Sequence, residues 1–380
     1  MTISSEYDVA IIGGGLAGLA SAIQLSKKGH SVILFEKEKY PFHKVCGEYI
    51  SLESWDFLTS LGLPLNEMNL PVIDRFILTS PNGKSFSTKL PLGGFGISRY
   101  KLDGMLSLIV KKSGVHVLEE TKVADIKFDQ SFLVNFQPGQ SNIRARICCA
   151  AFGKKSNFDI KWNRSFLQTH DKKLDNYVAV KYHIKTDWEK NLIGLHNFEN
   201  GYCGISKIED DKYCLCYMTK AENLKSAGNN ISELEKQFLY KNPHLKNIFL
   251  QSEICAEFPV TISQISFNKK SQVEDHILML GDAGGMITPL CGNGMSIALH
   301  ASKLAISEIE SFLTGNTSRF EMEQQYAQQW EKHFSRRLAV GRMIQRWFGS
   351  ELQSDLLVRC LKPFPKFVSF LIRQTHGETF

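Results

Sequence analysis

The sequence has 380 residues, enough for two domains or for one large domain with an inserted lobe. Its net charge of +6, without a long Lys/Arg stripe, argues against a nucleic-acid partner. Nine cysteines without paired CxxC spacing, and scattered histidines, argue against a metal site. No apolar run approaches about 18 residues and no basic-apolar leader opens the chain. We therefore expect a cytoplasmic protein with reduced thiols.

A βαβ pattern comes first. An apolar run at 9–12 leads into Gly13-x-Gly15-x-x-Gly18, a helical pattern follows, and a second apolar strand ends at Glu36. Gly13 allows a tight turn, Gly15 lets the backbone approach a pyrophosphate, and Gly18 lets helix and strand pack closely. The pattern predicts a dinucleotide site but does not distinguish FAD from NAD. The predicted binding residues are Gly13, Gly15, Leu16, Ala17, Gly18, Glu36 and Lys37.

Short helices and strands alternate from Glu36 to residue 156. The predicted elements are a helix at 51–61, two strands within 73–90 joined by a turn, an amphipathic helix after Arg99, and strands at 115–117, 121–128 and 144–151. From about 157 to 272 the pattern changes to alternating strands, which predicts a second sheet. Its clearest strands are at 177–184, 201–206 and 212–217, with one helix at 231–239.

A second glycine-rich segment follows an apolar strand at 277–280. Asp282, at the strand end, can accept hydrogen bonds from the hydroxyls of a polyol such as ribitol. The helix that begins near Met295 would stabilise negative charge on a reduced flavin through its positive end. Both features favour FAD as the cofactor. The predicted flavin-binding residues here are Gly281, Asp282, Gly292, Asn293, Gly294 and Met295, and Pro289 is a candidate catalytic residue.

The two glycine-rich segments resemble the FAD fingerprints of a flavoprotein superfamily. It contains the aromatic-ring hydroxylases, the geranylgeranyl reductases, the flavin-dependent halogenases and the electron-transfer quinone reductases. Lys44-x-Cys46-Gly47-Glu48 resembles a variant typical of the geranylgeranyl reductases, which runs beside the isoalloxazine ring. The resemblance implies that Cys46 lies near the flavin as a catalytic candidate. It also implies cofactor contacts from Lys44, from Arg99 to the pyrophosphate or ribityl region, and from the Val123 backbone to adenine.

Cys46 has two possible roles. A thiol beside a basic residue can act as a proton donor or charge-transfer partner. Alternatively, Cys46 and Gly47 only allow the backbone to approach the ring closely.

The chain departs from the family patterns at two places. Phe152 stands where the family usually has Asp. We therefore expect slow direct reduction by NAD(P)H, and a separate reductase or a quinol as the physiological donor. The segment 202–207 keeps the Tyr of the geranylgeranyl-reductase lipid-site motif but lacks its Trp and Phe-Pro, and the halogenase motif is absent. Tyr202 and Ile205 are the candidate substrate-binding residues.

We expect an α/β fold: a Rossmann-like FAD-binding domain with an inserted antiparallel β-sheet substrate domain and a helical C-terminal cap. The predicted divisions are 1–156 and 276–318 for the FAD-binding domain, 157–275 for the substrate lobe, and 319–380 for the cap. We expect the cap to pack on the FAD domain; alternatively, its apolar face borders a substrate pocket or touches a membrane surface. Its candidate pocket residues are Trp347, Phe348, Phe364 and Phe367.

The predicted function is that of an FAD-dependent oxidoreductase. The first hypothesis is a monooxygenase that hydroxylates a bulky hydrophobic aromatic or polyketide-like small molecule, because the reductase motif is broken and Gly204 leaves room for a ring. The first alternative is a reductase of an isoprenoid or other unsaturated, lipid-like substrate. The second is a flavin electron-relay or redox-sensing protein without its own substrate.

Overall fold

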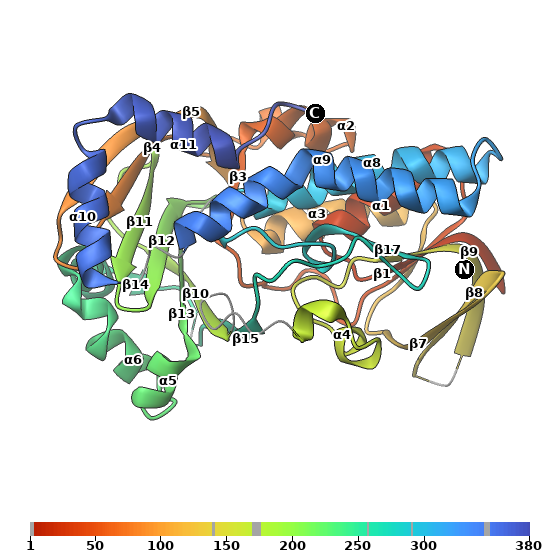
Figure 1. Ribbon diagram of the computed structural model, residues 1–380, viewed down its shortest axis with the longest axis horizontal. Helices are drawn as coiled ribbons and strands as arrows, with labels where there is room; N and C mark the ends of the chain where they lie inside the picture. The colour runs from red at the N-terminus through yellow and green to blue at the C-terminus, as the bar shows by residue number, and fades with distance from the viewer. Residues whose placement is uncertain (1–3, 139–140, 169–175, 257, 290–291, 346–349) are drawn as a thin grey trace.

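The computed structural model describes residues 4–138, 141–168, 176–256, 258–289, 292–345 and 350–380 (Figure 1). Two β-sheets lie side by side, and helices cover them. The first sheet has a parallel core with the strand order β17-β9-β1-β2-β6, extended by β16 beside β17 and by the β7–β8 hairpin beside β9. Its strands are β1 (Glu6–Ile12), β2 (Val32–Phe35), β6 (His116–Leu118), β7 (Lys122–Asp129), β8 (Ser131–Gln137), β9 (Ser141–Ala150), β16 (Val273–Glu274) and β17 (Ile277–Met279).

The central strands of the first sheet are continuous apolar runs because both of their faces are buried. Val9 and Ile11 of β1 pack with α1 (Leu16–Lys27), α3 (Arg99–Lys112) and α8 (Gly294–Leu313). Ala10 and Ile12 face the other side, where they pack with the β7–β8 hairpin and α4 (Asn157–Lys161). The sheet is therefore covered on both faces, as a doubly wound nucleotide-binding unit requires.

The second sheet has nine strands in the order β14-β10-β13-β12-β11-β4-β5-β3, with β15 also beside β10. All its pairs are antiparallel except β11 with β4. Three strands, β3, β4 and β5, come from the segment before residue 156, so the sheet joins chain segments on both sides of that predicted boundary. The strands are β3 (Tyr49–Ser51), β4 (Val72–Thr79), β5 (Ser85–Gly96), β10 (Tyr177–Lys185), β11 (Leu192–Phe198), β12 (Gly201–Lys207), β13 (Tyr213–Lys220), β14 (Glu253–Ile254) and β15 (Val260–Ile265).

Short helices pack on the outer side of the second sheet. The predicted helix at 231–239 is α6 (Ile231–Gln237), and the sequence interpretation missed α5 (Ala221–Ser226) and α7 (Pro243–Gln251) beside it. The predicted helix at 51–61 is shorter than expected: β3 takes its first residue, a 3-10 turn follows, and α2 (Trp55–Ser60) completes it. Ser51 accepts a hydrogen bond from the Glu53 N–H, which favours the tight turn at that point.

The C-terminal region is helical, as predicted, but its packing differs in part. α9 (Arg319–Gln345) packs on α8 and on the first sheet, where the Tyr326 hydroxyl donates to the Met279 carbonyl at 2.7 Å. α10 (Glu351–Leu361) and α11 (Pro365–Thr375) instead pack on the second sheet through Val358 and Val368 (Figure 1). The expectation that the whole cap packs on the FAD domain is therefore wrong for α10 and α11. Across the described residues, no helix has the length and apolarity needed to span a bilayer.

Candidate FAD site and its neighbourhood

The first glycine loop has little room at two positions and open space at the third. Gly13 has φ +106, and a Cβ there would lie 2.5 Å from the Ala151 carbonyl oxygen. A Cβ on Gly18 would overlap the Gly13 carbonyl oxygen. At Gly15 the nearest atoms to a Cβ would be Lys44 Nζ at 3.7 Å and an Arg99 guanidinium nitrogen at 3.8 Å. The loop therefore leaves an opening at Gly15, at the start of α1, with two cations facing it.

α1 begins without a side-chain cap. Gly15 is its N-cap residue and offers no acceptor to the first N–H groups. Leu16 and Ala17, in the first turn, bury their side chains in the core, so only their backbone can meet a ligand. The uncapped N–H groups and the positive end of the helix dipole form an anion site, and the pyrophosphate of FAD fits it.

Glu36 lies at the end of β2, beside the glycine loop. Its carboxylate accepts hydrogen bonds from the N–H groups of Gly14 at 3.0 Å and of Glu38 at 3.1 Å. This places an acid where a ribose hydroxyl would need one. Lys37 has an exposed side chain, with its Nζ 3.8 Å from Glu38 Oε1. Val123 lies in β7, where the ladder with β8 shifts register between Val123 and Asp125.

Asp103 holds the two cations that face Gly15. Arg99 donates to both of its carboxylate oxygens at 2.7 Å, and Lys44 Nζ lies 3.2 Å from one of them. Burial alone would raise the pKa of the Asp103 carboxyl, but the Arg99 and Lys44 charges outweigh it and hold the pKa below its usual value. Sequence reasoning missed Asp103, although its spacing of four residues from Arg99 on a helix was a usable signal.

The second glycine segment packs directly on the first. Gly281, with φ +58, would bring a Cβ within 3.2 Å of the Ala17 side chain. Asp282 is half-buried in the following turn, and its carbonyl accepts a hydrogen bond from Lys270 Nζ at 2.9 Å. Lys270 also donates to the Lys154 carbonyl at 3.0 Å. This lysine, which sequence reasoning missed, ties the Asp282 turn to the loop that follows β9. Burial lowers its pKa to about 8.

The start of α8 carries an unsatisfied polar atom. Asn293 caps the helix without a side-chain bond to it; instead its Nδ2 donates to the Thr375 carbonyl at 3.1 Å. Its Oδ1 is buried and finds no hydrogen-bond partner among the described residues. The predicted residues Gly294 and Met295 form the first turn of α8, and Gly292 (φ +66) lies against Tyr49. A polar flavin ring fits this edge, because it has both donors and acceptors.

Pro289, the other catalytic candidate, is exposed. Its carbonyl accepts a hydrogen bond from the Gly292 N–H at 2.9 Å, so it helps to shape the turn before α8. Leu290 and Cys291 lie outside the described residues.

The segment Cys46–Glu48 is fixed at each of its three carbonyls. Cys214 Sγ donates to the Cys46 carbonyl at 3.2 Å and Ser206 Oγ to the Gly47 carbonyl at 3.1 Å. The Ile97 N–H donates to the Glu48 carbonyl at 3.1 Å. Glu48 itself is fully buried with φ +56, a conformation that a non-glycine residue adopts only at a cost. The second sheet thus sets the position of the predicted flavin-side segment.

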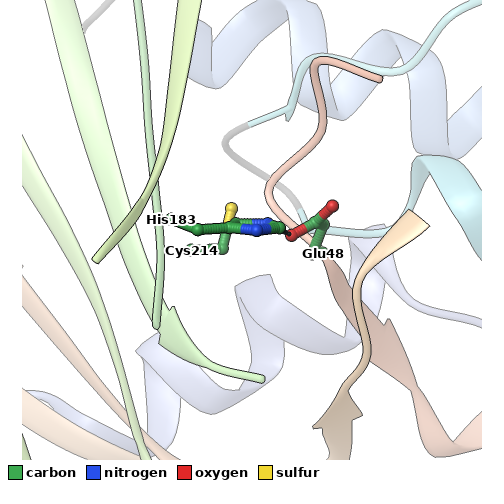
Figure 2. A group of neighbouring side chains, drawn as sticks. All are labelled: Glu48, His183 and Cys214. Carbon is green, nitrogen blue, oxygen red and sulfur yellow. Dashed lines mark hydrogen bonds and ion pairs between the residues drawn. The ribbon is translucent and has the colours of Figure 1, made fainter. Parts of the chain in front are cut away.

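The Glu48 carboxylate lies at the centre of a buried polar cluster (Figure 2). Lys181 Nζ lies 2.7 Å from Oε1 and His183 Nε2 lies 2.6 Å from Oε2, while the Arg99 N–H donates to Oε1 at 2.9 Å. Burial alone would raise the pKa of Glu48, but the His183 hydrogen bond and the Lys181 charge outweigh it and lower the pKa. The same carboxylate raises the pKa of Lys181 against its burial. Glu48 is therefore a charged anchor.

Glu48, His183 and Cys214 also form a set of metal-ligand types, with their ligand atoms within 4.8 Å of one another. Two ligands on one zinc ion stand roughly 3.3 Å apart at ordinary bond lengths. The contact of 2.6 Å between His183 and Glu48 is shorter than that. Lys181 already supplies a positive charge to the carboxylate, and burial raises the pKa of the Cys214 thiol well above its usual value. These facts describe an ion-paired anchor better than a metal centre.

A cavity of about 580 Å³ lies between α3 and β10, on the other side of His183. His43 lies 4.7 Å from the Tyr100 ring and 5.2 Å from the His183 ring, measured between ring centroids. Burial, together with the Lys181 and His183 charges, lowers the pKa of His43. His183 therefore links the polar cluster to a space that water can enter. The apolar part of the lining includes Pro41, Met105, Leu108, Ile254, Phe258 and Val260.

One face of the second sheet lies toward the predicted cofactor site, and this face has a polar half and an apolar half. We call this side its inner face. Its polar half consists of Lys181, His183, Ser206 and Cys214, which contact the segment Cys46–Glu48. Its apolar half consists of Leu78, Tyr177, Ala179, Leu195, Tyr202 and Met218, which pack with Met286, Val358 and Val368. Val45, next to Cys46, also packs against this apolar half.

The predicted substrate residues separate in the structure. Tyr202 lies on the apolar half of the inner face, whereas Ile205, three residues along the same strand, lies on the opposite face with Leu234 and Leu245. The two therefore cannot line one pocket. Phe364 and Phe367, expected near the substrate, are instead 61% and 52% exposed on the outer side of the cap. Trp347 and Phe348 lie outside the described residues.

Comparisons with known proteins agree with this geometry. The family FAD dependent oxidoreductase matches residues 8–44, which hold the glycine loop, Glu36 and Lys44. The chain is 26% identical over 333 residues to conditioned medium factor receptor 1 of Dictyostelium discoideum, covering 81% of this chain but only 64% of that protein. It is 25% identical over 355 residues to digeranylgeranylglycerophospholipid reductase of Methanococcus vannielii, covering 87% and 84% of the two chains.

Two solved structures share the fold. A geranylgeranyl bacteriochlorophyll reductase-like protein from Thermoplasma acidophilum superposes with a TM-score of 0.80 at 17% identity, covering 99% of this chain and 97% of that one. The flavin-dependent brominase Bmp2 superposes with a TM-score of 0.78 at 18% identity, covering 97% and 93%. FAD is the cofactor that fits the glycine loops, the paired cations and the edge of α8. Residues 8–44 thus match the FAD dependent oxidoreductase family, and the chain shares its fold with the reductase-like protein and the brominase.

Proposed function

We propose that this oxidoreductase reduces double bonds in a long, apolar, unsaturated substrate such as an isoprenoid lipid. The observation that carries the proposal is the apolar half of the inner face, which runs from Val45, beside Cys46, to α10 and α11. A chain-like apolar molecule that enters between this half and the side chains packed on it gains about 0.8 kcal/mol for each methylene that it buries. The Methanococcus relative, named for reduction of a geranylgeranyl lipid, supports the same substrate class.

Reduction of a double bond needs a hydride and a proton. Reduced FAD, when bound, supplies the hydride to one alkene carbon. The other carbon takes a proton from a side chain of the protein, and the Cys46 thiol is our candidate donor. Glu48 does not serve as the donor, because its paired cations keep it ionised. It holds the Cys46–Glu48 segment and His183 in place, and His183 borders the cavity from which protons can be replaced.

Hydroxylation is the second candidate. Gly204 favours it, because this position of the inner face carries no side chain and a Cβ there would meet nothing closer than 3.8 Å. A bulky aromatic molecule could lie there, with reduced flavin and oxygen supplying the added oxygen atom.

One experiment separates the candidates. The FAD-loaded protein is reduced with dithionite without oxygen and mixed with a geranylgeranyl lipid or its fully saturated analogue. We expect the unsaturated lipid alone to reoxidise the flavin, and the product to gain two hydrogens per reduced double bond by mass spectrometry. Equal behaviour of both lipids would contradict the reductase proposal. Admitting air with an alkylated phenol tests the second candidate, whose product carries one added oxygen. An electron relay would give neither product but would still reduce an artificial acceptor.

A further inference from the structure

The outer side of the α10–α11 pair carries exposed aromatic side chains. Phe364, Phe367 and Phe370 are 61%, 52% and 52% exposed, and Leu356 of α10 is also exposed. Phe367 and Phe370 are three residues apart on α11, with their rings 6.5 Å apart, and Phe364 is the residue just before the helix. Such a group at a single short helix is unusual for a surface that faces only water.

The same segment is purely basic. From Leu356 to Gly377 the sequence contains Arg359, Lys362, Lys366 and Arg373 and no Asp or Glu. All four cations are exposed, and none forms an ion pair with a residue in the described part of the chain. The nearest acid along α10, Asp355, is already paired with Lys84. An anionic partner would therefore meet four cations with no neighbouring acid in this stretch.

The other side of the same helices packs on the protein core. Val358 and Val368 are buried in the apolar half of the inner face, and the Thr375 carbonyl at the end of α11 accepts the hydrogen bond from Asn293. The exposed phenylalanines are thus presented by a fixed helix. The α10–α11 pair thus lies between these phenylalanines and the apolar half of the inner face, which includes Tyr202.

We infer that the outer side of α10–α11 docks onto the surface of an anionic phospholipid bilayer. We call this surface the docking face and define it by Phe364, Phe367, Phe370, Arg359, Lys362, Lys366 and Arg373. The phenylalanines enter the boundary between headgroups and acyl chains, while the cations bind lipid phosphates. In this orientation the apolar half of the inner face lies next to the membrane, behind α10 and α11. The inference does not rest on the reductase proposal, because docking needs no turnover.

Vesicle flotation tests the docking face. The FAD-loaded protein is mixed with vesicles of phosphatidylcholine, with or without phosphatidylglycerol. We expect binding to the anionic vesicles only, and loss of that binding as salt is raised. The triple variant F364S/F367S/F370S and the double variant K362Q/K366Q should each bind about tenfold less tightly or worse. Retained FAD and an unchanged circular dichroism spectrum show that a variant is folded.

Matched controls lie outside the docking face. Phe320→Ser removes an equally exposed phenylalanine at the start of α9, and K225Q/K332Q removes two exposed lysines from α5 and α9. Both should bind vesicles like the unchanged protein. If the triple variant does not fold, the single variant Phe370→Ser replaces it.

Two outcomes would overturn the inference. In the first, the unchanged protein ignores anionic vesicles, or the docking-face variants bind as well as the controls. In the second, the unchanged protein is a dimer in sedimentation and the phenylalanine variants are monomers. The face would then be an interface between two copies of the chain.

Discussion

The two sides of the cofactor region are built differently. On the first sheet, the glycine loop and Glu36 lie within one short stretch of chain, so their contacts are local. On the second sheet, Glu48 bonds with Lys181, 133 positions further along, and with His183. The nucleotide-binding contacts therefore follow from a local sequence motif. The ion pairs of Glu48 depend instead on the register in which β10 and β13 pair. The first two predictions below test these two kinds of contact, and the others test residues next to the cofactor site.

Glu48→Gln should have the largest effect. The neutral side chain keeps its shape but leaves Lys181 buried without its counter-charge, so we expect the free energy of unfolding to fall by about 3–5 kcal/mol. Chemical denaturation measures it. The matched control is Glu235→Gln, since Glu235 of α6 is buried against the same sheet and accepts hydrogen bonds from the Tyr182 and Tyr217 hydroxyls, with no cation paired to it among the described residues. The control should lose no more than about 1.5 kcal/mol. Equal losses would mean that the ion pair adds nothing.

Gly18→Ala and Gly15→Ala should separate packing from binding within the motif. A Cβ at Gly18 has no room, so we expect a loss of about 1–3 kcal/mol in the free energy of unfolding. At Gly15 the fold has room, but the added methyl group occupies space that the pyrophosphate needs. The apoprotein of Gly15→Ala should therefore keep its melting temperature and lose FAD affinity. If Gly18→Ala is as stable as the unchanged protein and binds FAD normally, the close packing at Gly18 is not needed for the fold.

Asp282→Ala should weaken FAD binding by roughly 1–3 kcal/mol, because a partly buried acceptor for the ribityl hydroxyls is lost. Fluorescence titration of the apoprotein with FAD measures it. Lys37→Ala is the control, since Lys37 points into solvent. If both substitutions have the same effect, Asp282 does not contact the cofactor.

Lys270→Met should change how stability depends on pH. Burial lowers the pKa of Lys270 from 10.5 to about 8, so between these values the unfolded chain binds more protons than the folded one. The free energy of unfolding therefore gains a rising contribution from this group above pH 8, and that contribution is absent in Lys270→Met. Comparing the two proteins by denaturation from pH 7 to 10 isolates the difference. Parallel curves would show that folding does not lower the pKa of Lys270.

NADPH alone should reduce the bound flavin slowly. Phe152 replaces the usual Asp, and its ring packs 6.1 Å from Phe158 and 6.3 Å from Trp162. Stopped-flow absorbance under anaerobic conditions measures the rate. Dithionite serves as the positive control for a reducible flavin. Rapid, stoichiometric bleaching by NADPH without a partner protein would contradict the prediction.

The sequence predicted the parts of the molecule that depend on neighbouring residues. The βαβ unit, the turn at Gly281 and the helix after Asn293 follow from glycine positions and apolar runs. Asp103 could have been predicted as a partner of Arg99, because it lies one helical turn from it. Lys181 and Lys270 were not, because a buried lysine looks like any other lysine until the strand or loop that presents it is placed. Ile205 was misjudged because the alternation of β12 sends it to the face opposite Tyr202.

The two sheets are also interleaved along the chain. The second sheet takes β3, β4 and β5 early and β10 to β15 later, while the first sheet receives β17 only at Ile277–Met279. During synthesis the second sheet cannot be completed before residue 265 has emerged, nor the first sheet before residue 279. The parallel pairing of β4 with β11 joins Arg75 to Leu192 across this interval. The nascent chain must therefore keep the edge of β4 unpaired while more than a hundred further residues emerge, and the two sheets should then form, and unfold, as one cooperative unit.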